Sequence, residues 1–104
     1  MKTTVNALRI VLTGPRTIAL SGELDLAVAR SLVETLEPVT AQPGPLTIDL
    51  SDLRFMDVAG YRAIRKLAAS MRGGPLVLLH ANGAVARLLE IVEAVLAGNI
   101  VLAA

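Results

Sequence analysis

Asp49-Leu-Ser-Asp-Leu-Arg-Phe-Met-Asp-Val-Ala-Gly60 is the stretch from which the organisation of this chain can be worked out. The apolar run 46–50 at its start predicts a short buried strand, which residues 53–56 extend. Asp57 is a residue type favoured as a helix N-cap, and a helical pattern follows it over residues 58–71. Its apolar stripe has spacings of three and four residues and contains Gly60, Ile64, Leu67, Ala68 and Met71.

Upstream of this stretch, the sequence predicts a hairpin and a first helix. Two β-rich runs, over residues 7–12 and 17–20, flank a Gly-Pro turn signal. Residues 25–36 then carry apolar side chains at helical spacing, with Asp25 as the expected N-cap. Pro38 and the loop after it are expected to end this helix.

Downstream, the pattern continues as strand, helix and strand. Residues 76–79 form an aliphatic run, residues 85–95 have helical periodicity with Leu88, Leu89, Val92 and Val95 inward, and residues 100–102 form a last strand. The order β-β-α-β-α-β-α-β predicts an α/β layer fold with parallel strand pairs joined by right-handed crossovers. We expect a single domain over residues 1–104, with a mixed sheet of about four to five strands and helices packed against it.

Composition excludes several classes of protein and disfavours others. The 104 residues contain no cysteine, so disulfides and thiolate metal sites are excluded, and a cytoplasmic protein is expected. A net charge of +1 disfavours direct nucleic-acid binding, and no apolar run is long enough for a signal peptide or membrane insertion. His80 has no partner for catalysis, and Asp49, Asp52 and Asp57 are an improbable metal site. We therefore expect no enzyme, metal or cofactor.

Two short motifs carry a resemblance to a known family. Gly22-Glu-Leu-Asp25 and Asp57-Val-Ala-Gly60 together resemble the STAS domains of bacterial anti-sigma factor antagonists, and the predicted element order agrees with that fold. In that family the second motif normally reads Asp-Ser-Ser/Thr-Gly. Val58 stands at the position of the phosphorylatable serine and Ala59 at the next hydroxyl position. Neither side chain can accept a phosphate, so the resemblance implies a switch that lacks its phosphoacceptor.

The resemblance also implies a partner-binding surface around the start of the second helix. Its candidate residues are Asp25, Asp57, Val58, Ala59, Gly60, Tyr61, Arg62 and Arg65. For several of them a purely structural role remains open. Gly60 can serve helix packing and Asp25 helix capping, and Arg62 and Arg65, together with the neighbouring Lys66, can form a solvated charged face. An exposed patch of Val58, Ala59 and Tyr61 would suit either a partner or a homodimer.

Three functions are consistent with these features. The resemblance implies a protein that binds an anti-sigma factor of the serine-kinase type and thereby frees a sigma factor, acting constitutively or under control of its own abundance. An alternative is an accessory STAS subunit of an ABC-type lipid transport complex, docked on its ATPase. A third is a scaffold subunit of a larger signalling assembly.

Overall fold

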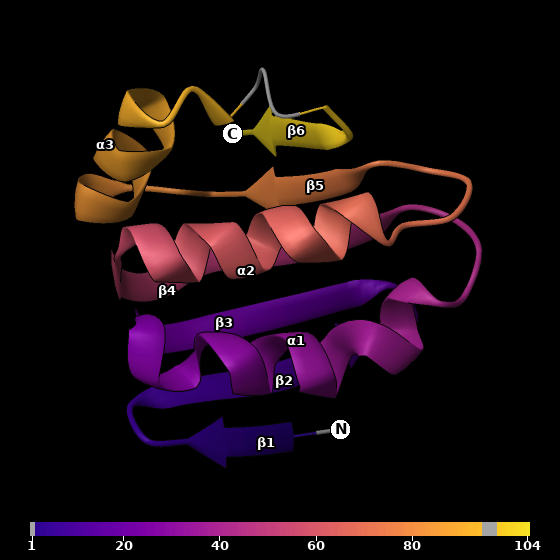
Figure 1. The fold of residues 1–104 in the computed structure, drawn as a ribbon, viewed down its shortest axis with the longest axis horizontal. Coiled ribbons are helices and arrows are strands. Elements are labelled where there is room, and N and C mark those ends of the chain that lie inside the picture. Colours follow the sequence, from indigo (N-terminus) through magenta and orange to yellow (C-terminus); the bar gives the residue numbers. More distant parts are fainter. Residues whose placement is uncertain (1, 95–97) are drawn as a thin grey trace.

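Six strands form one mixed sheet in the order β1-β2-β3-β4-β5-β6 in this computed structural model, which describes residues 2–94 and 98–104 (Figure 1). The strands are β1 (Lys2–Val5), β2 (Leu8–Gly14), β3 (Thr17–Leu24), β4 (Leu46–Met56), β5 (Leu76–Leu79) and β6 (Ile100–Ala103). The helices are α1 (Leu26–Thr40), α2 (Val58–Ala69) and α3 (Gly83–Ile91). The first three strands pair antiparallel, and the pairs from β3 to β6 are parallel, so the predicted mixed α/β fold is confirmed.

The sheet has one strand more than the prediction of four to five, because β1 was not recognised. Thr3, Thr4 and Val5 are β-branched residues that favour strands, but a run of only four residues is a short signal. In the structure Lys2 lies opposite Val11 and Val5 lies opposite Leu8 in an antiparallel pair. Asn6 follows with φ 51°, a left-handed conformation that asparagine tolerates better than most residues. The tight turn that Asn6 allows returns the chain to form β2.

Helices α1 and α2 lie side by side on one face of the sheet (Figure 1). Between the helices and the sheet lies an aliphatic core whose largest fully buried side chains include Leu8, Ile10, Leu20, Leu32, Leu36, Ile48, Leu50 and Ile64. Removing apolar side chains of this size from water stabilises the fold by roughly 1.5–3 kcal/mol each. Because alternate strand residues point to opposite faces, their neighbours Val11, Ala19 and Val77 lie on the other face and remain partly exposed.

The expectation that Pro38 ends the first helix is wrong, because α1 continues to Thr40. The residues after the proline complete a last turn: the Ala41 amide donates to the Glu37 carbonyl at 3.0 Å, and the Thr40 hydroxyl donates to the same carbonyl at 3.1 Å. The missing proline N–H therefore removes one hydrogen bond without stopping the helix. Thr40 is buried, with 1% of its surface exposed.

The second and third helices also differ from prediction at their ends. Helix α2 stops at Ala69 instead of residue 71. Just after it, the Ser70 hydroxyl donates to the Leu67 carbonyl at 2.8 Å, and its oxygen lies 3.0 Å from the Thr40 hydroxyl oxygen. Helix α3 begins two residues earlier than predicted and ends at Ile91. The prediction that Val95 faces the core lies outside the described residues.

The loop between α1 and β4 is held by one side chain from the hairpin turn. The Arg16 guanidinium donates to the carbonyl oxygens of Val39 at 2.7 Å, Pro45 at 2.9 Å, Gly44 at 2.9 Å and Gln42 at 3.4 Å. One of these acceptors, the Val39 carbonyl, lies in the last turn of α1, and the other three belong to the loop that follows it. Within the described part of the chain, no helix is long and apolar enough to cross a membrane.

Candidate functional site

The candidate site lies where β3 and β4 end and two helices begin. Along their pairing, Thr17 lies opposite Thr47 and Leu24 lies opposite Met56, so β4 uses two more residues than β3 over the same length. Two irregularities in register absorb the extra residues. As a result both strands end level with each other, and the starts of α1 and α2 meet at one edge of the sheet.

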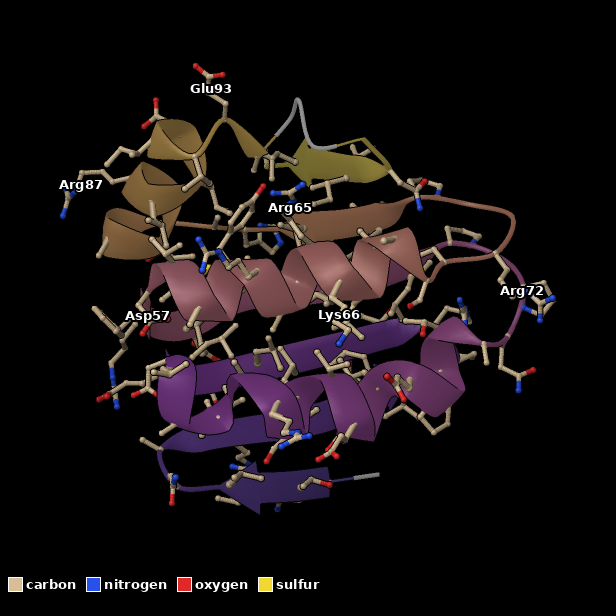
Figure 2. The ribbon with its side chains drawn as sticks, in the orientation of Figure 1. Asp57, Arg65, Lys66, Arg72, Arg87 and Glu93 are labelled. Atoms are coloured by element: carbon tan, nitrogen blue, oxygen red, sulfur yellow. The ribbon has the colours of Figure 1, made fainter. Side chains whose placement is uncertain are left out.

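Asp57 joins these two helix starts through a single carboxylate. Its Oδ1 accepts the Gly60 amide at 2.7 Å, which caps α2 as predicted, and its Oδ2 accepts the Leu26 amide of α1 at 3.1 Å. The Asp57 amide in turn donates to the Leu24 carbonyl at 3.2 Å. Figure 2 shows Asp57 at the first turn of α2, on the side that faces α1. The link to α1 was not predicted, because it joins residues 31 positions apart.

Asp25 is the second carboxylate at this edge, and it caps α1 as predicted. Its Oδ1 accepts the Ala27 amide at 3.0 Å. The N-terminus of a helix carries partial positive charge from its unpaired amides, so each carboxylate lies where negative charge is stabilising. The structural role proposed for Asp25 is therefore present, and a partner-binding role is compatible with it.

The exposed apolar side chains at this edge are Val58 and Leu26. Val58, the first residue of α2, has 46% of its surface exposed, and Leu26, the first residue of α1, has 75% exposed. Ala59 is partly exposed beside them. Leu26 was not predicted as part of this surface, although its position off the apolar stripe of α1 was a usable signal. The expected apolar patch is therefore real at Val58 and is extended by Leu26.

The expectation that Tyr61 belongs to this exposed patch is wrong. Its side chain has 4% of its surface exposed, because its position in α2 turns it into the core with Ile64 and Ala68. Gly60 is also buried, and a Cβ at this position would lie 2.4 Å from the Leu24 carbonyl oxygen. The close approach made possible by Gly60 is thus to β3 of the same chain, which is the packing role left open by the sequence.

The predicted basic strip is divided between the two sides of α2. Arg62 and Lys66 line a groove of about 400 Å³ between α1 and α2, whereas Arg65 points to the side of β5 (Figure 2). All three side chains are exposed. The α1 wall of the groove contains Ala29, Arg30, Val33, Glu34 and Glu37, and the rest of the α2 wall is Ala59 and Ala63.

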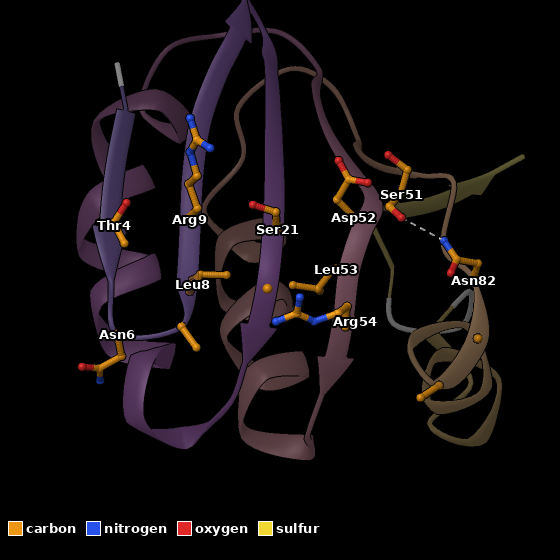
Figure 3. Close-up of a pocket in the computed structure, with 14 residues that line it drawn as sticks. Thr4, Asn6, Leu8, Arg9, Ser21, Ser51, Asp52, Leu53, Arg54 and Asn82 are labelled. Atoms are coloured by element: carbon orange, nitrogen blue, oxygen red, sulfur yellow. Dashed lines mark hydrogen bonds between the residues drawn. The ribbon is translucent and has the colours of Figure 1, made fainter.

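A second hollow, of about 570 Å³, lies on the opposite face of the sheet and contains none of the predicted site residues (Figure 3). At its rim the Asn82 side chain donates to the Ser51 carbonyl at 3.2 Å and to the His80 carbonyl at 3.1 Å. Arg54, also in the lining, is 3.9 Å from the Glu23 carboxylate. Among the described residues, no group of three or more His, Cys, Asp or Glu side chains is placed to hold a metal ion.

Comparisons with known proteins agree with this architecture. The chain is similar to the crystal structure of an anti-sigma factor antagonist from Mycobacterium paratuberculosis, with a TM-score of 0.71 and 18% identity. The match covers 97% of this chain and 82% of that chain. It is also similar to the anti-sigma factor antagonist SpoIIAA in its unphosphorylated form, with a TM-score of 0.59, 18% identity, and coverage of 92% of this chain and 86% of that chain. A search of curated proteins gave no match. The family model described as "Mlab, STAS domain" matches residues 9–94, and the chain therefore belongs to the STAS domain family.

Proposed function

We propose that this protein is a regulatory binding protein of the anti-sigma factor antagonist type. It binds an anti-sigma factor of the serine-kinase type and so releases a sigma factor, and it acts by binding instead of catalysis. The observation that carries the proposal is the exposed position of Val58 at the start of α2, beside the carboxylate of Asp57 that caps two helices. This edge is rigidly built yet presents apolar side chains to solvent, which suits a protein interface.

In this proposal the surface has no phosphorylation switch. A phosphate on the first residue of α2 would place nearly two negative charges beside Asp57 and would oppose a docked partner. Val58 carries only methyl groups at that position, so the surface stays apolar in the presence of a kinase and ATP. Binding is then controlled by the amount of the protein or by competition for the surface.

The first test is affinity purification of the tagged protein from its native cells, followed by mass spectrometry. Val58→Asp adds a negative charge at the binding surface, and aspartate in the first turn of a helix does not oppose folding. Val101→Asp is a matched control, because Val101 is 45% exposed in β6, away from the start of α2. We expect an anti-sigma factor with the wild type and the control but not with Val58→Asp. Its equal recovery with Val58→Asp would contradict the proposed surface.

A second test addresses phosphorylation directly. The recovered kinase and ATP are incubated with the wild type and with Val58→Ser, and intact masses are measured. We expect one phosphate on Val58→Ser and none on the wild type. A stoichiometric phosphate on the wild type that also weakens binding would refute the absence of a switch.

The alternative function, an accessory subunit docked on the ATPase of an ABC-type lipid transport complex, is favoured by a specific observation. A subunit that docks on an ATPase does not need a hydroxyl group at the first residue of α2, where this chain has Val58. The same purification distinguishes the two functions, since recovery of a transporter ATPase would assign the accessory role. Recovery of a multi-protein signalling assembly would instead assign the scaffold role.

A further inference from the structure

The start of α3 carries the one asparagine in the sequence that is followed by glycine, Asn82-Gly83. An asparagine deamidates when the backbone nitrogen of the next residue attacks its side chain, and a following glycine leaves that nitrogen uncovered. The other two asparagines, Asn6 and Asn99, precede an alanine and an isoleucine, whose side chains shield the nitrogen. The sequence therefore favours this reaction at Asn82.

The structure leaves the attacking nitrogen accessible. Gly83 is exposed, its φ is 55°, and a Cβ built on it would have no atom within 4 Å. Its N–H precedes the first bond of the helix, which runs from the Ala86 amide to the Asn82 carbonyl at 3.2 Å, so no acceptor inside α3 is available to it. Neither a neighbouring atom nor the helix ladder protects the Gly83 nitrogen.

The Asn82 side chain does not cap the helix that it precedes. An asparagine at the N-cap commonly accepts an amide of the first turn, but Asn82 makes no such bond. Its Nδ2 instead donates to the Ser51 carbonyl of β4 at 3.2 Å and to the His80 carbonyl at 3.1 Å (Figure 3). Asn82 thus ties the start of α3 to β4. Both bonds lie at the surface, where water can replace them, so the side chain can rotate toward the Gly83 nitrogen.

We propose that Asn82 is a site of spontaneous deamidation, which exchanges the tie between α3 and β4 for a cap on α3. The Gly83 nitrogen loses its proton and forms a bond to Cγ of Asn82, the bond from Cγ to Nδ2 breaks, and Nδ2 leaves with that proton as ammonia. The product is a cyclic succinimide. Water from the solvent then adds to one of the two ring carbonyl carbons and opens the ring, which gives aspartate or isoaspartate.

The aspartate product cannot keep the tie to β4. A carboxylate has no N–H to donate, so the carbonyl oxygens of Ser51 and His80 repel it. The amides of Ala84 and Val85, in the first turn of α3, offer it donors, and the helix dipole stabilises negative charge there. Formation of aspartate at position 82 therefore releases the start of α3 from β4 and caps the helix.

The isoaspartate product has the opposite effect on the helix. Its main chain runs through the former side chain, which adds a carbon atom to the backbone between residue 82 and Gly83. The carbonyl that accepts the Ala86 amide at 3.2 Å is then displaced, and the first turn of α3 loses this bond. The two products can therefore be distinguished by their effect on α3.

The reaction also changes the hollow on the open face of the sheet, to which Asn82 contributes. Its charged lining residues are Arg9, Arg54 and Asp52, so two positive charges face one negative charge. A carboxylate at position 82 brings the formal charge of this lining to zero. The start of α2, where a partner is proposed to bind, belongs to a different surface.

Trypsin places each asparagine in its own peptide, so the reaction can be followed at all three positions in one sample. The peptides are residues 3–9, 73–87 and 88–104. The purified chain is incubated at neutral and mildly alkaline pH in water labelled with heavy oxygen, digested in ordinary water, and analysed by mass spectrometry. We expect Asn82 to lose ammonia at least roughly tenfold faster than Asn6 or Asn99, with one labelled oxygen in each product. The rate should rise with pH, because the attacking nitrogen must lose its proton.

Gly83→Ala is the variant that addresses the attacking nitrogen, because its Cβ covers that atom. It should slow the reaction at position 82 at least roughly tenfold. The control is Gly14→Ala, whose Cβ would lie 3.7 Å from its nearest neighbours in the hairpin and should leave the rate unchanged. Asn82→Asp makes one product directly, and hydrogen exchange at the Ala84 and Val85 amides should slow in it. Circular dichroism verifies that each variant is folded.

Three results would overturn the proposal. Asn82 could react no faster than Asn6 and Asn99, or Gly83→Ala could leave its rate unchanged, and either result would exclude Asn82-Gly83 as a favoured site. Unchanged exchange at the start of α3 in Asn82→Asp would show that no cap replaces the tie. These assays contain no partner protein, so their outcome is independent of the proposed function.

Discussion

Replacing Asp57 by alanine should destabilise the protein through two helices at once. The carboxylate accepts the Gly60 amide of α2 at 2.7 Å and the Leu26 amide of α1 at 3.1 Å, so both hydrogen bonds are lost together. Asp25 provides an internal comparison, because its carboxylate caps α1 alone through the Ala27 amide at 3.0 Å. The two aspartates therefore separate the effect of a single cap from that of a shared one.

The expected loss follows from these contacts. An N-cap side chain contributes about 1 kcal/mol, and the carboxylate adds about 0.3–1 kcal/mol at each helix start through the helix dipole. The second hydrogen bond, to an amide near the surface, contributes roughly 0.5–1 kcal/mol, because water can replace it. We expect Asp57→Ala to lower the free energy of unfolding by about 2–4 kcal/mol and Asp25→Ala by about 1.3–2 kcal/mol.

Urea denaturation measures both values, and native-state hydrogen exchange tests the shared role. Asp57→Ala should speed exchange at the start of α1 as well as α2, although the substitution lies in the second helix. Asp57→Asn keeps one side-chain oxygen for the Gly60 amide and should show an intermediate loss. A loss for Asp57→Ala no larger than that for Asp25→Ala, with exchange in α1 unchanged, would refute the shared cap.

Three further substitutions test other parts of the fold. Gly60→Ala should lower the free energy of unfolding by about 1–3 kcal/mol or more, because the new Cβ would lie 2.4 Å from the Leu24 carbonyl oxygen. Gly14→Ala is the control: the nearest neighbours of its Cβ would lie at 3.7 Å, so it should have a much smaller effect on the urea midpoint. Arg16→Lys should lower the thermal midpoint by about 4–8 °C for each kcal/mol lost, because a lysine cannot donate to four carbonyl oxygens; an unchanged midpoint would show that these bonds contribute no stability. The backbone amide of Ser51 donates to the Asp49 carboxylate at 2.9 Å, and this hydrogen bond is the main cause that lowers the pKa of Asp49. Its contribution to stability is therefore complete above the ordinary aspartate pKa of about 4 and is lost as the pH falls through the lowered pKa, so Asp49→Asn should lose less stability than the wild type on acidification in urea titrations at several pH values.

Sequence reasoning was most successful where one element carries its own signal. Both N-caps, Asp25 and Asp57, were predicted from residue type and from the apolar stripes that follow them. The hairpin was predicted from its turn residues, and parallel pairing from alternating strands and helices. These features depend on short stretches of chain, whose conformational preferences are readable without knowledge of the tertiary structure.

What the sequence did not reveal depends on contacts between distant elements. The bond from the Leu26 amide to Asp57 requires the two irregularities in β4 that bring the strand ends level, and no local pattern predicts them. Tyr61 was assigned to the surface by its place in a motif, whereas the helical stripe with Ile64 and Ala68 places it in the core. Arg16 gave no signal as a ligand of carbonyl groups on a loop more than twenty residues away.

The strand order has a consequence for how the chain folds. Because the strands lie in the sheet in the order of the sequence, each new strand adds to the edge formed by the one before it. No strand must be inserted between two that have already paired, and the chain ends at opposite edges. The antiparallel pairs β1–β2 and β2–β3 join residues close in the sequence, whereas each parallel pair joins residues on either side of a helical crossover, so we expect the hairpins to form early and the parallel pairs to form more slowly. The outermost strands, β1 and β6, are correspondingly the units expected to open first, at a free energy below that of global unfolding.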